Sequence, residues 1–230
     1  MNRIILLTVA FLSLLFISCS ESTSPSTNNL TFVSGINQST LSGSVVNIKG
    51  DEIQNEVTGI KIESIRILLN NISVKLNDND RNIKLSPVVF TITDSSKTYE
   101  FANADLPSGN MDKIKIEIHR FASSEIGSYQ NNAIFKDFAT NERYTILIKG
   151  KILSGSNETD FEYKTDIVGN LSFDFNPPIN IQDNINQTIE FQFQSDMVFK
   201  SNNIILDPRD SKNKSHIDNQ IKNAIKAIKK

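Results

Sequence analysis

Four charged residues at alternate positions are the first group in the sequence that could do chemistry. They are Asp160, Glu162, Lys164 and Asp166. Paired carboxylates serve as general acid and base when they converge in a cleft. Residues two apart share one face of a strand, and apolar residues fill the other face here, so the pattern favours a solvated charged surface. Of the two histidines, His119 is predicted to face outward and His216 to begin a terminal helix, and neither has neighbours that suggest a metal or catalytic site.

Oxygen-bearing side chains also recur at every second position in a short polar segment. Asp78, Asp80 and Asn82 match the D-x-D-x-N opening of a calcium-binding loop. The sixth position, where that loop needs glycine, is Ile83, and the twelfth, where it needs glutamate, is Val89. The segment is therefore predicted to be a polar hairpin turn, and a loose calcium site unlike an EF-hand is the alternative.

The only cysteine of the chain, Cys19, lies directly after a hydrophobic N-terminal segment. Arg3 precedes an unbroken run of apolar or small residues, Ile4 to Ile17, and Ser18 separates that run from the cysteine. A short positive region before an apolar core of about 7–15 residues is typical of a secretory signal, and a membrane-spanning helix needs about 20 residues. Residues 1–18 are therefore predicted to be a signal peptide.

The segment Leu-Phe-Ile-Ser-Cys at residues 15–19 resembles the lipobox of bacterial lipoproteins. It departs from the usual pattern at Phe16, where that family has leucine, because Leu15 lies one place too early. The resemblance implies cleavage before Cys19 and a thioether-linked diacylglycerol on its sulfur. Two or three acyl chains would anchor the protein firmly, since each buried methylene contributes about 0.8 kcal/mol. An ordinary signal peptide or transmembrane anchor with an unmodified cysteine is the alternative.

Residues 19–29 are rich in serine, threonine and asparagine and lack apolar periodicity. Such a composition cannot bury a core and predicts a flexible tether between the lipid and the folded body. Ser20 resembles the residue that directs lipoproteins of enteric bacteria to the outer membrane. That resemblance implies a lipid-anchored protein of the bacterial cell envelope, in the outer membrane, on its periplasmic or surface face.

Composition excludes several classes of function. The 230 residues include 24 Lys+Arg and 26 Asp+Glu, and this formal net charge of −2 offers no electrostatic surface for nucleic acid. One cysteine excludes a disulfide framework or a cysteine-rich zinc site, and two histidines make a histidine metal cluster or a Ser-His-Asp triad hard to build. Carbohydrate binding has no support, because tryptophan is absent and Tyr99, Tyr144 and Tyr163 fall in phase with apolar residues. We predict no cofactor and no enzymatic activity.

From about residue 30 to residue 206, apolar residues alternate with polar ones, which predicts strands with one buried and one wet face. The predicted strands cover 60–62, 65–69, 72–76, 88–92, 99–101, 114–118, 144–148, 161–167, 171–175, 189–193 and 198–205. A phase slip at Ser64 predicts a bulge, and Gly169-Asn170 is predicted to join 161–167 and 171–175 in a hairpin. About ten to thirteen strands at this spacing predict an all-β fold, an antiparallel β-sandwich.

Turn-forming residues separate these strands at 77–80, 106–109, 154–157 and 176–178, and 122–142 is predicted to be a long connection. After residue 206 the period changes. Isoleucines at 217, 221, 225 and 228 predict an amphipathic C-terminal helix, with Ser215 as its cap and lysines in its last turns. We expect its isoleucines to pack on the sandwich, and contact with anionic lipid or a partner is the alternative.

Four segments follow from these patterns. They are a signal peptide at 1–18, a tether at 19–29, a β-sandwich at 30–206, and a polar linker with a helix at 207–230.

The order of features from residue 57 to residue 121 resembles a family of bacterial envelope lipoproteins described as domain of unknown function 4382. The matching features are the strands at 60–76 and 88–93, the turn Leu106-Pro107-Ser108-Gly109, the alternating strand Ile114–Ile118, and the tail at 205–210. The usual T-D-A-P opening is absent, and Thr31-Phe32-Val33-Ser34 stands in its place. The resemblance implies an all-β domain in the cell envelope, and a transthyretin-like sandwich is one form that this domain could take. It brings no catalytic residues.

The combined interpretation is a lipid-anchored envelope protein that binds or scaffolds through a β-sandwich. Its expected partners are the membrane, through the lipid on Cys19, and an envelope or extracellular protein whose identity the sequence does not give. A structural or adhesive surface subunit of fimbrial type is the alternative, and it would need an open sheet edge or a donated strand. An enzyme with a site built from scattered carboxylates is a third hypothesis.

Overall fold

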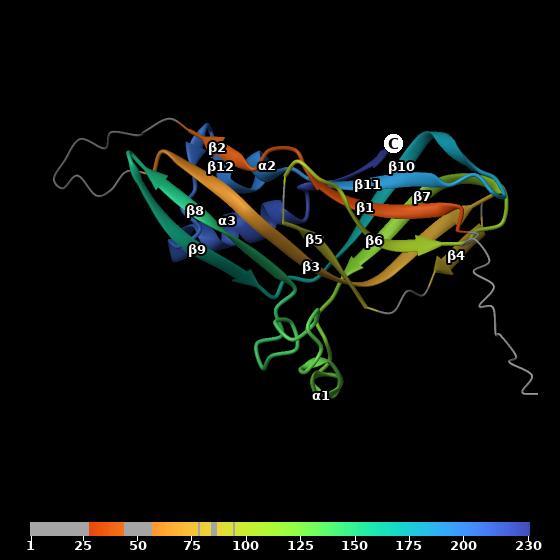
Figure 1. Cartoon of the computed structure of the whole chain (residues 1–230), viewed down its shortest axis with the longest axis horizontal. Helices are drawn as coiled ribbons and strands as arrows, with labels where there is room; N and C mark the ends of the chain where they lie inside the picture. Colours follow the sequence, from red (N-terminus) through yellow and green to blue (C-terminus); the bar gives the residue numbers. More distant parts are fainter. Residues whose placement is uncertain (1–27, 44–56, 78, 84–86, 94) are drawn as a thin grey trace, which may run out of the picture.

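The computed structural model describes residues 28–43, 57–77, 79–83, 87–93 and 95–230. These residues form an all-β sandwich in which a four-stranded sheet packs against an eight-stranded sheet, as predicted (Figure 1). Its larger strands are β1 (Leu30–Ile36), β3 (Gly59–Leu76), β5 (Val88–Ile92), β6 (Tyr99–Ala104), β7 (Gly109–Ile118), β8 (Ile146–Ser154), β9 (Asn157–Thr165), β10 (Gly169–Ile181), β11 (Gln187–Phe193) and β14 (Ile225–Lys229). The shorter elements are β2 (Thr40–Ser42), β4 (Asn79–Ile83), β12 (Lys200–Ser201), β13 (Ile204–Ile205), α1 (Ile126–Tyr129), α2 (Ser195–Phe199) and α3 (Ser211–Ile221).

The four-stranded sheet joins the two ends of the described chain. Its order is β14-β11-β1-β6, with β1 parallel to β11 from the pair Leu30↔Gln187 to the pair Ile36↔Phe193. Strand β14 pairs antiparallel with β11, and β6 pairs antiparallel with β1. The sheet therefore depends on pairing between segments that are more than 150 residues apart in sequence.

The eight-stranded sheet is organised around the long strand β3. Strand β8 pairs with residues 59–67 of β3, and β7 pairs with residues 69–76 of β3. Strand β9 then pairs with β8, and β10 pairs with β7. The register with β8 shifts between Ile62 and Ser64, which confirms the bulge predicted from the phase slip. A second shift, between Leu69 and Asn71, explains why the apolar alternation changes phase again at Ile72.

Alternating apolar residues from both sheets form the core, as the period of two predicts. Phe191 on β11 lies at its centre. Its ring centroid is 5.9 Å from Phe32 on β1, 5.9 Å from Phe101 on β6, and 5.4 Å from Phe173 on β10. These aromatic contacts tie the small sheet to the large one. Helix α3 adds Ile217 and Ile221 to the same core.

The predicted connection at 122–142 carries a small core of its own, on the opposite face of the large sheet. Phe121, Tyr129 and Phe135 stack against one another and cover apolar side chains of β3, β5 and β8. The Arg66 guanidinium lies 5.0 Å from the ring centroid of Phe138 and pairs with Asp137. In Figure 1 this segment projects below the sheets, at the position of α1.

The predicted hairpin around Gly169-Asn170 is wrong. Strand β9 pairs with β8, and β10 pairs with β7, so the two strands lie at opposite ends of the sheet order β10-β7-β3-β8-β9. Residues 166–168 are therefore a crossing between distant strands. The turn predicted at Asn176-Pro177-Pro178 is also wrong, since it lies within β10, where the register with β7 is interrupted between Asp174 and Ile179.

The strand predicted at 198–205 is mostly wrong. Helix α2 runs to Phe199, and only β12 and β13 form a two-stranded hairpin beyond it. Val198 and Phe199 are buried in the core, as they would be in a helix or in a strand. A short apolar run therefore does not distinguish the two structures.

The predicted C-terminal helix is right over its first part and wrong over its second. Helix α3 is capped by Asp210, whose side chain accepts from the Lys212 amide, in place of the predicted cap Ser215. It ends at Ile221, and Ile225 to Lys229 form β14 along β11. An edge strand leaves a row of backbone groups unpaired, and β14 satisfies those of β11, which outweighs the helical spacing of the isoleucines.

Candidate functional site

The structure describes some, but not all, of the site residues predicted from the sequence. Cys19 and Asp78 lie outside the described residues. The backbones of Asp80 and Asn82 lie in β4, which forms the predicted hairpin with β3, but in its second strand and not in the turn. Within the described part of the chain, no group of three or more His, Cys, Asp or Glu residues could hold a metal ion.

The predicted charged face of residues 160–166 is present and extends onto the neighbouring strand. Register places Lys149 opposite Glu162 and Lys151 opposite Asp160, with all four side chains on the outer face of the large sheet. The buried residues between them, Phe161 among them, face the core. We call Lys149, Lys151, Glu158, Asp160, Glu162 and Lys164 the charged strip.

Ion pairs between β8 and β9, and one within β9, balance the charges of the charged strip. Glu162 bridges two lysines, at 3.1 Å from Lys149 Nζ and 2.8 Å from Lys164 Nζ. Lys151 Nζ lies 2.9 Å from Asp160 Oδ1 and 3.9 Å from Glu158 Oε2. Exposed pairs of this kind contribute only about 0–1 kcal/mol each to stability.

The same contacts fix the protonation states of the charged strip. The hydrogen bond from Lys164 holds the pKa of Glu162 below its usual value, and the bond to Glu162 raises the pKa of Lys164. The bond to Asp160 likewise raises the pKa of Lys151. Catalytic acids and bases need pKa values near the working pH, and these shifts move the groups away from it. The charged strip is therefore suited to polar recognition.

Two shallow grooves run along β9. The first, of about 600 Å³, is lined by Glu63, Lys149, Gly150, Lys151, Asp160, Phe161 and Glu162. The second, of about 410 Å³, is lined by Glu162, Tyr163, Lys164, Pro208, Arg209, Ser211 and Lys214. Glu162 belongs to both, so the grooves are adjacent and together follow the charged strip to the start of α3.

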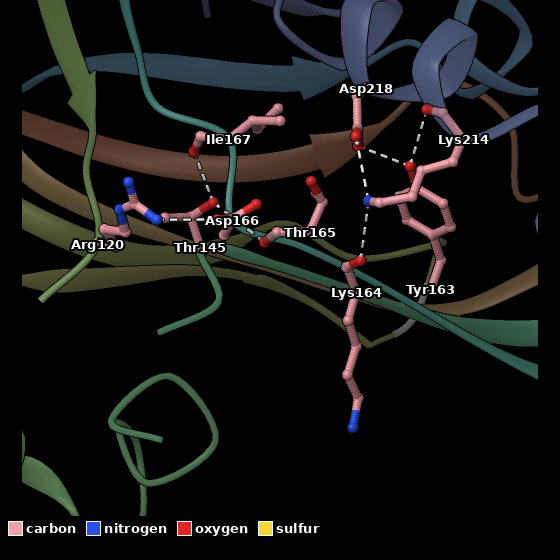
Figure 2. Close-up of polar contacts among 9 residues, drawn as sticks. All are labelled: Arg120, Thr145, Tyr163, Lys164, Thr165, Asp166, Ile167, Lys214 and Asp218. Carbon is pink, nitrogen blue, oxygen red and sulfur yellow. Dashed lines mark hydrogen bonds and ion pairs between the residues drawn. The ribbon is translucent and has the colours of Figure 1, made fainter. Parts of the chain in front are cut away.

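Tyr163 fastens helix α3 to the inner side of β9. Its hydroxyl donates to Asp218 Oδ1 at 2.6 Å, and Lys214 Nζ donates to Asp218 Oδ2 at 3.1 Å. Figure 2 shows the side chains of Tyr163 and Lys214 converging on Asp218, whereas the side chain of Lys164 points away from the helix. Tyr163 and Lys214 also line the second groove, so these hydrogen bonds connect the wall of that groove to the buried side of β9.

Replacing Tyr163 with phenylalanine is expected to lower the free energy of unfolding by about 1.5–3 kcal/mol, the usual contribution of a hydrogen bond to a charged group. Burial, and then the bond to Asp218, raise the pKa of Tyr163 above its ordinary value of 10.0. Because the folded-state pKa is the higher one, this contribution is complete below about pH 10 and is lost as the pH rises further. Urea denaturation of both proteins at pH 7, 9 and 10.5 measures it, and a difference that grows with pH would contradict the assignment.

The free edge of β9 is partly covered. The Thr145 amide, directly before β8, donates to the Thr165 carbonyl oxygen at 2.8 Å, so the alternate residues from 158 to 164 direct their backbone groups away from β8. Lys214 Nζ approaches the Lys164 carbonyl oxygen at 3.5 Å. Beyond Lys164, the chain is held by an ion pair of 2.9 Å between Arg120 and Asp166 and by a hydrogen bond of 2.7 Å from Thr145 Oγ1 to Ile167 (Figure 2).

Sequence reasoning missed the most buried carboxylate, Glu190 on β11. It lies between the core residues Ile189 and Phe191, so alternation places it on the outer face, where a charged residue is normally wet. Its side chain is nevertheless only 4% exposed and pairs with Lys230. It lies over Gly35 of the neighbouring strand, and a Cβ there would come within 2.1 Å of Glu190 Oε1. Gly35 lies diagonally across from Glu190, two residues beyond its direct partner Val33, so the sequence alone gave no signal of this contact.

His119 is exposed directly after β7, as predicted. His216 lies half-buried in the middle of α3 and not at its start, because the helix begins earlier, at Ser211. No helix among the described residues is long and apolar enough to cross a membrane.

Comparisons with protein-family models, with curated proteins and with solved structures found no match. The resemblance to domain of unknown function 4382 therefore stays a prediction from its motifs.

Proposed function

We propose that this chain is a lipid-anchored protein of the bacterial cell envelope that binds or scaffolds a partner through its β-sandwich, without catalysis. One observation carries the anchoring: the sole cysteine directly follows the apolar run that ends at Ile17, and a polar segment separates it from the first strand at Leu30. A signal, an acylation residue and a spacer in this order are what a lipid anchor requires.

The outer face of the sandwich supports a binding role. The charged strip offers both signs of charge at alternate positions, and its two grooves are open and lined by both polar and apolar groups. A partner with complementary charges could exchange these internal ion pairs for external ones at little cost, because exposed pairs contribute little to stability.

The protonation states support the absence of catalysis. The carboxyl group of Glu162 has a lowered pKa, and Tyr163 has a raised one. Both groups therefore keep a single protonation state around neutral pH and are poor candidates for proton transfer.

Metabolic labelling with radioactive palmitate tests the anchor. The wild-type protein expressed in bacteria is expected to take up label and to sediment with membranes. Cys19→Ala is expected to lose the label completely and to leave the membrane fraction, because its thioether cannot form. Ser18→Ala is the matched control and keeps the cysteine. Equal label in the wild type and in Cys19→Ala would refute the proposal.

A structural or adhesive subunit is the second candidate, and the free edge of β9 favours it. Backbone groups of the alternate residues from 158 to 162 point away from β8, as an added strand would require. Chemical crosslinking of whole cells separates the two functions: a polymerising subunit gives a ladder of multiples, whereas an anchored binding module gives discrete products.

A further inference from the structure

The folded body begins at a fixed point, the buried residue Asn29. Its side-chain amide donates to the Leu106 carbonyl oxygen at 2.7 Å, and its side-chain oxygen accepts from the Leu106 amide at 2.8 Å. Its own carbonyl oxygen accepts from the Gln187 amide at 2.9 Å. The side chain is 1% exposed. The chain therefore enters the sandwich from one defined end, between the turns that follow β6 and β10.

Several turns meet at that end and are bonded to one another. Ser108 Oγ donates to Asp183 Oδ1 at 2.8 Å, which ties the β6–β7 turn to the β10–β11 turn. The Asn110 amide donates to Asn77 Oδ1 at 2.8 Å, which adds the end of β3. We call the turns at 105–108 and 182–186 the entry end. Ile185 lies at its surface with 47% of its area exposed, an unusual position for a large apolar side chain in a polar turn.

The charged strip extends toward the opposite end of the molecule. Strand β3 connects the two ends, with Leu76 beside Met111 near the entry end and Gly59 beside Leu153 near the β8–β9 hairpin. Eighteen residues at about 3.3 Å each give β3 a length of roughly 55 Å. Figure 1 shows β4 and β10 at one end of the long axis and the β8–β9 hairpin at the other.

The length of chain before Asn29 limits how far the entry end can lie from the anchor. Ten Cα–Cα steps lead from Cys19 to Asn29, and they span at most about 36 Å. This limit is shorter than the roughly 55 Å of β3, so the point of attachment biases the orientation of the body.

We infer that the entry end, with Ile185 exposed on it, faces the lipid bilayer, and that the β8–β9 hairpin and the charged strip face away from it. This inference rests on the proposed lipid anchor. The bilayer contacts the entry end because the chain leads from that end to Cys19. Its extended length is shorter than the body, so the opposite end is held farther from the bilayer. The charged strip then stays open to soluble partners.

Single-thiol labelling tests this orientation in the full-length protein. Once Cys19 is acylated, the wild type has no free thiol, so Ile185→Cys and Ser156→Cys each carry one reactive site. Ile185 is exposed at the entry end, and Ser156 is exposed in the β8–β9 turn. Each variant is coupled to a donor fluorophore and reconstituted into phosphatidylethanolamine–phosphatidylglycerol vesicles that contain an acceptor-labelled lipid.

Energy transfer to the bilayer is expected to be roughly twofold or more higher from residue 185 than from residue 156, because the two ends are separated by about the length of β3. Ala133→Cys, in the projecting connection, gives an intermediate reference. Equal transfer, or higher transfer from residue 156, would overturn the inference. Failure of the anchor gives a different result. The wild type itself would then react with a thiol-reactive maleimide fluorophore, because Cys19 would carry a free thiol.

Discussion

Gly150→Ala is expected to lower the free energy of unfolding by about 3 kcal/mol, at the upper end of the usual cost of overpacking. Gly150 on β8 lies between Ile62 on β3 and Phe161 on β9. A Cβ at this position would lie 2.1 Å from the Lys61 carbonyl oxygen, 2.9 Å from Phe161 Cε1 and 3.1 Å from Ile62 Cα. Two of these atoms are backbone, so relief requires a shift of β3 at its bulge.

Urea denaturation measures this loss as a lower midpoint with an unchanged slope. Gly127→Ala is the matched control, because nothing lies within 4 Å of its added Cβ and the residue is in helix α1. Alanine there is expected to be neutral or to stabilise by up to about 1 kcal/mol, through helix propensity. An effect of Gly150→Ala no larger than that of Gly127→Ala would show that β3 does not press on β8.

Phe191→Ala is expected to cost about 3–5 kcal/mol, the range for removing a fully buried aromatic side chain. The residue is 0% exposed, and its ring contacts Phe32, Phe101 and Phe173. Its removal leaves a cavity where the two sheets meet, and it also breaks three aromatic contacts that contribute beyond buried area. Since domains are stable by only about 5–15 kcal/mol, this single change threatens the fold.

Thermal denaturation followed by circular dichroism measures this effect, with Phe135→Ala as the control. Phe135 is half-buried in the separate small core of residues 121–147 and contacts two rings. Its loss is expected to cost about 1–2 kcal/mol, within the range of typical substitutions. Equal losses in the two variants would mean that the projecting connection is as integral to the fold as the main core.

The sequence predicted what depends on local alternation. The strand at 88–92, the bulge at Ser64, the turn at 154–157 and the outward charges at 160–166 all follow from a period of two. A period of two says which side of a strand is wet, but it does not say which strand lies next to it. The wrong hairpin of β9 with β10 is the result, because the partner of each strand is chosen by long-range packing.

The errors near the C-terminus have a related cause. The spacing of Ile221 and Ile225 fits a helix, and the spacing of Ile225 and Ala227 fits a strand equally well. The chain adopts the strand because it pairs with the open edge of β11. The burial of Glu190 likewise needs Gly35, which is 155 positions away in sequence. At the candidate site, Tyr163 was predicted to join the core, but its bond to Asp218 depends on where α3 packs.

The parallel pairing of β1 with β11 sets the order in which the body can assemble. Leu30 must wait for Gln187, 157 residues later, before its strand gains that neighbour. At about 5–20 residues per second, a growing polypeptide needs roughly 10–30 s to supply it. During that interval β1 lacks one of its two neighbours, so the four-stranded sheet cannot close until most of the polypeptide has been made.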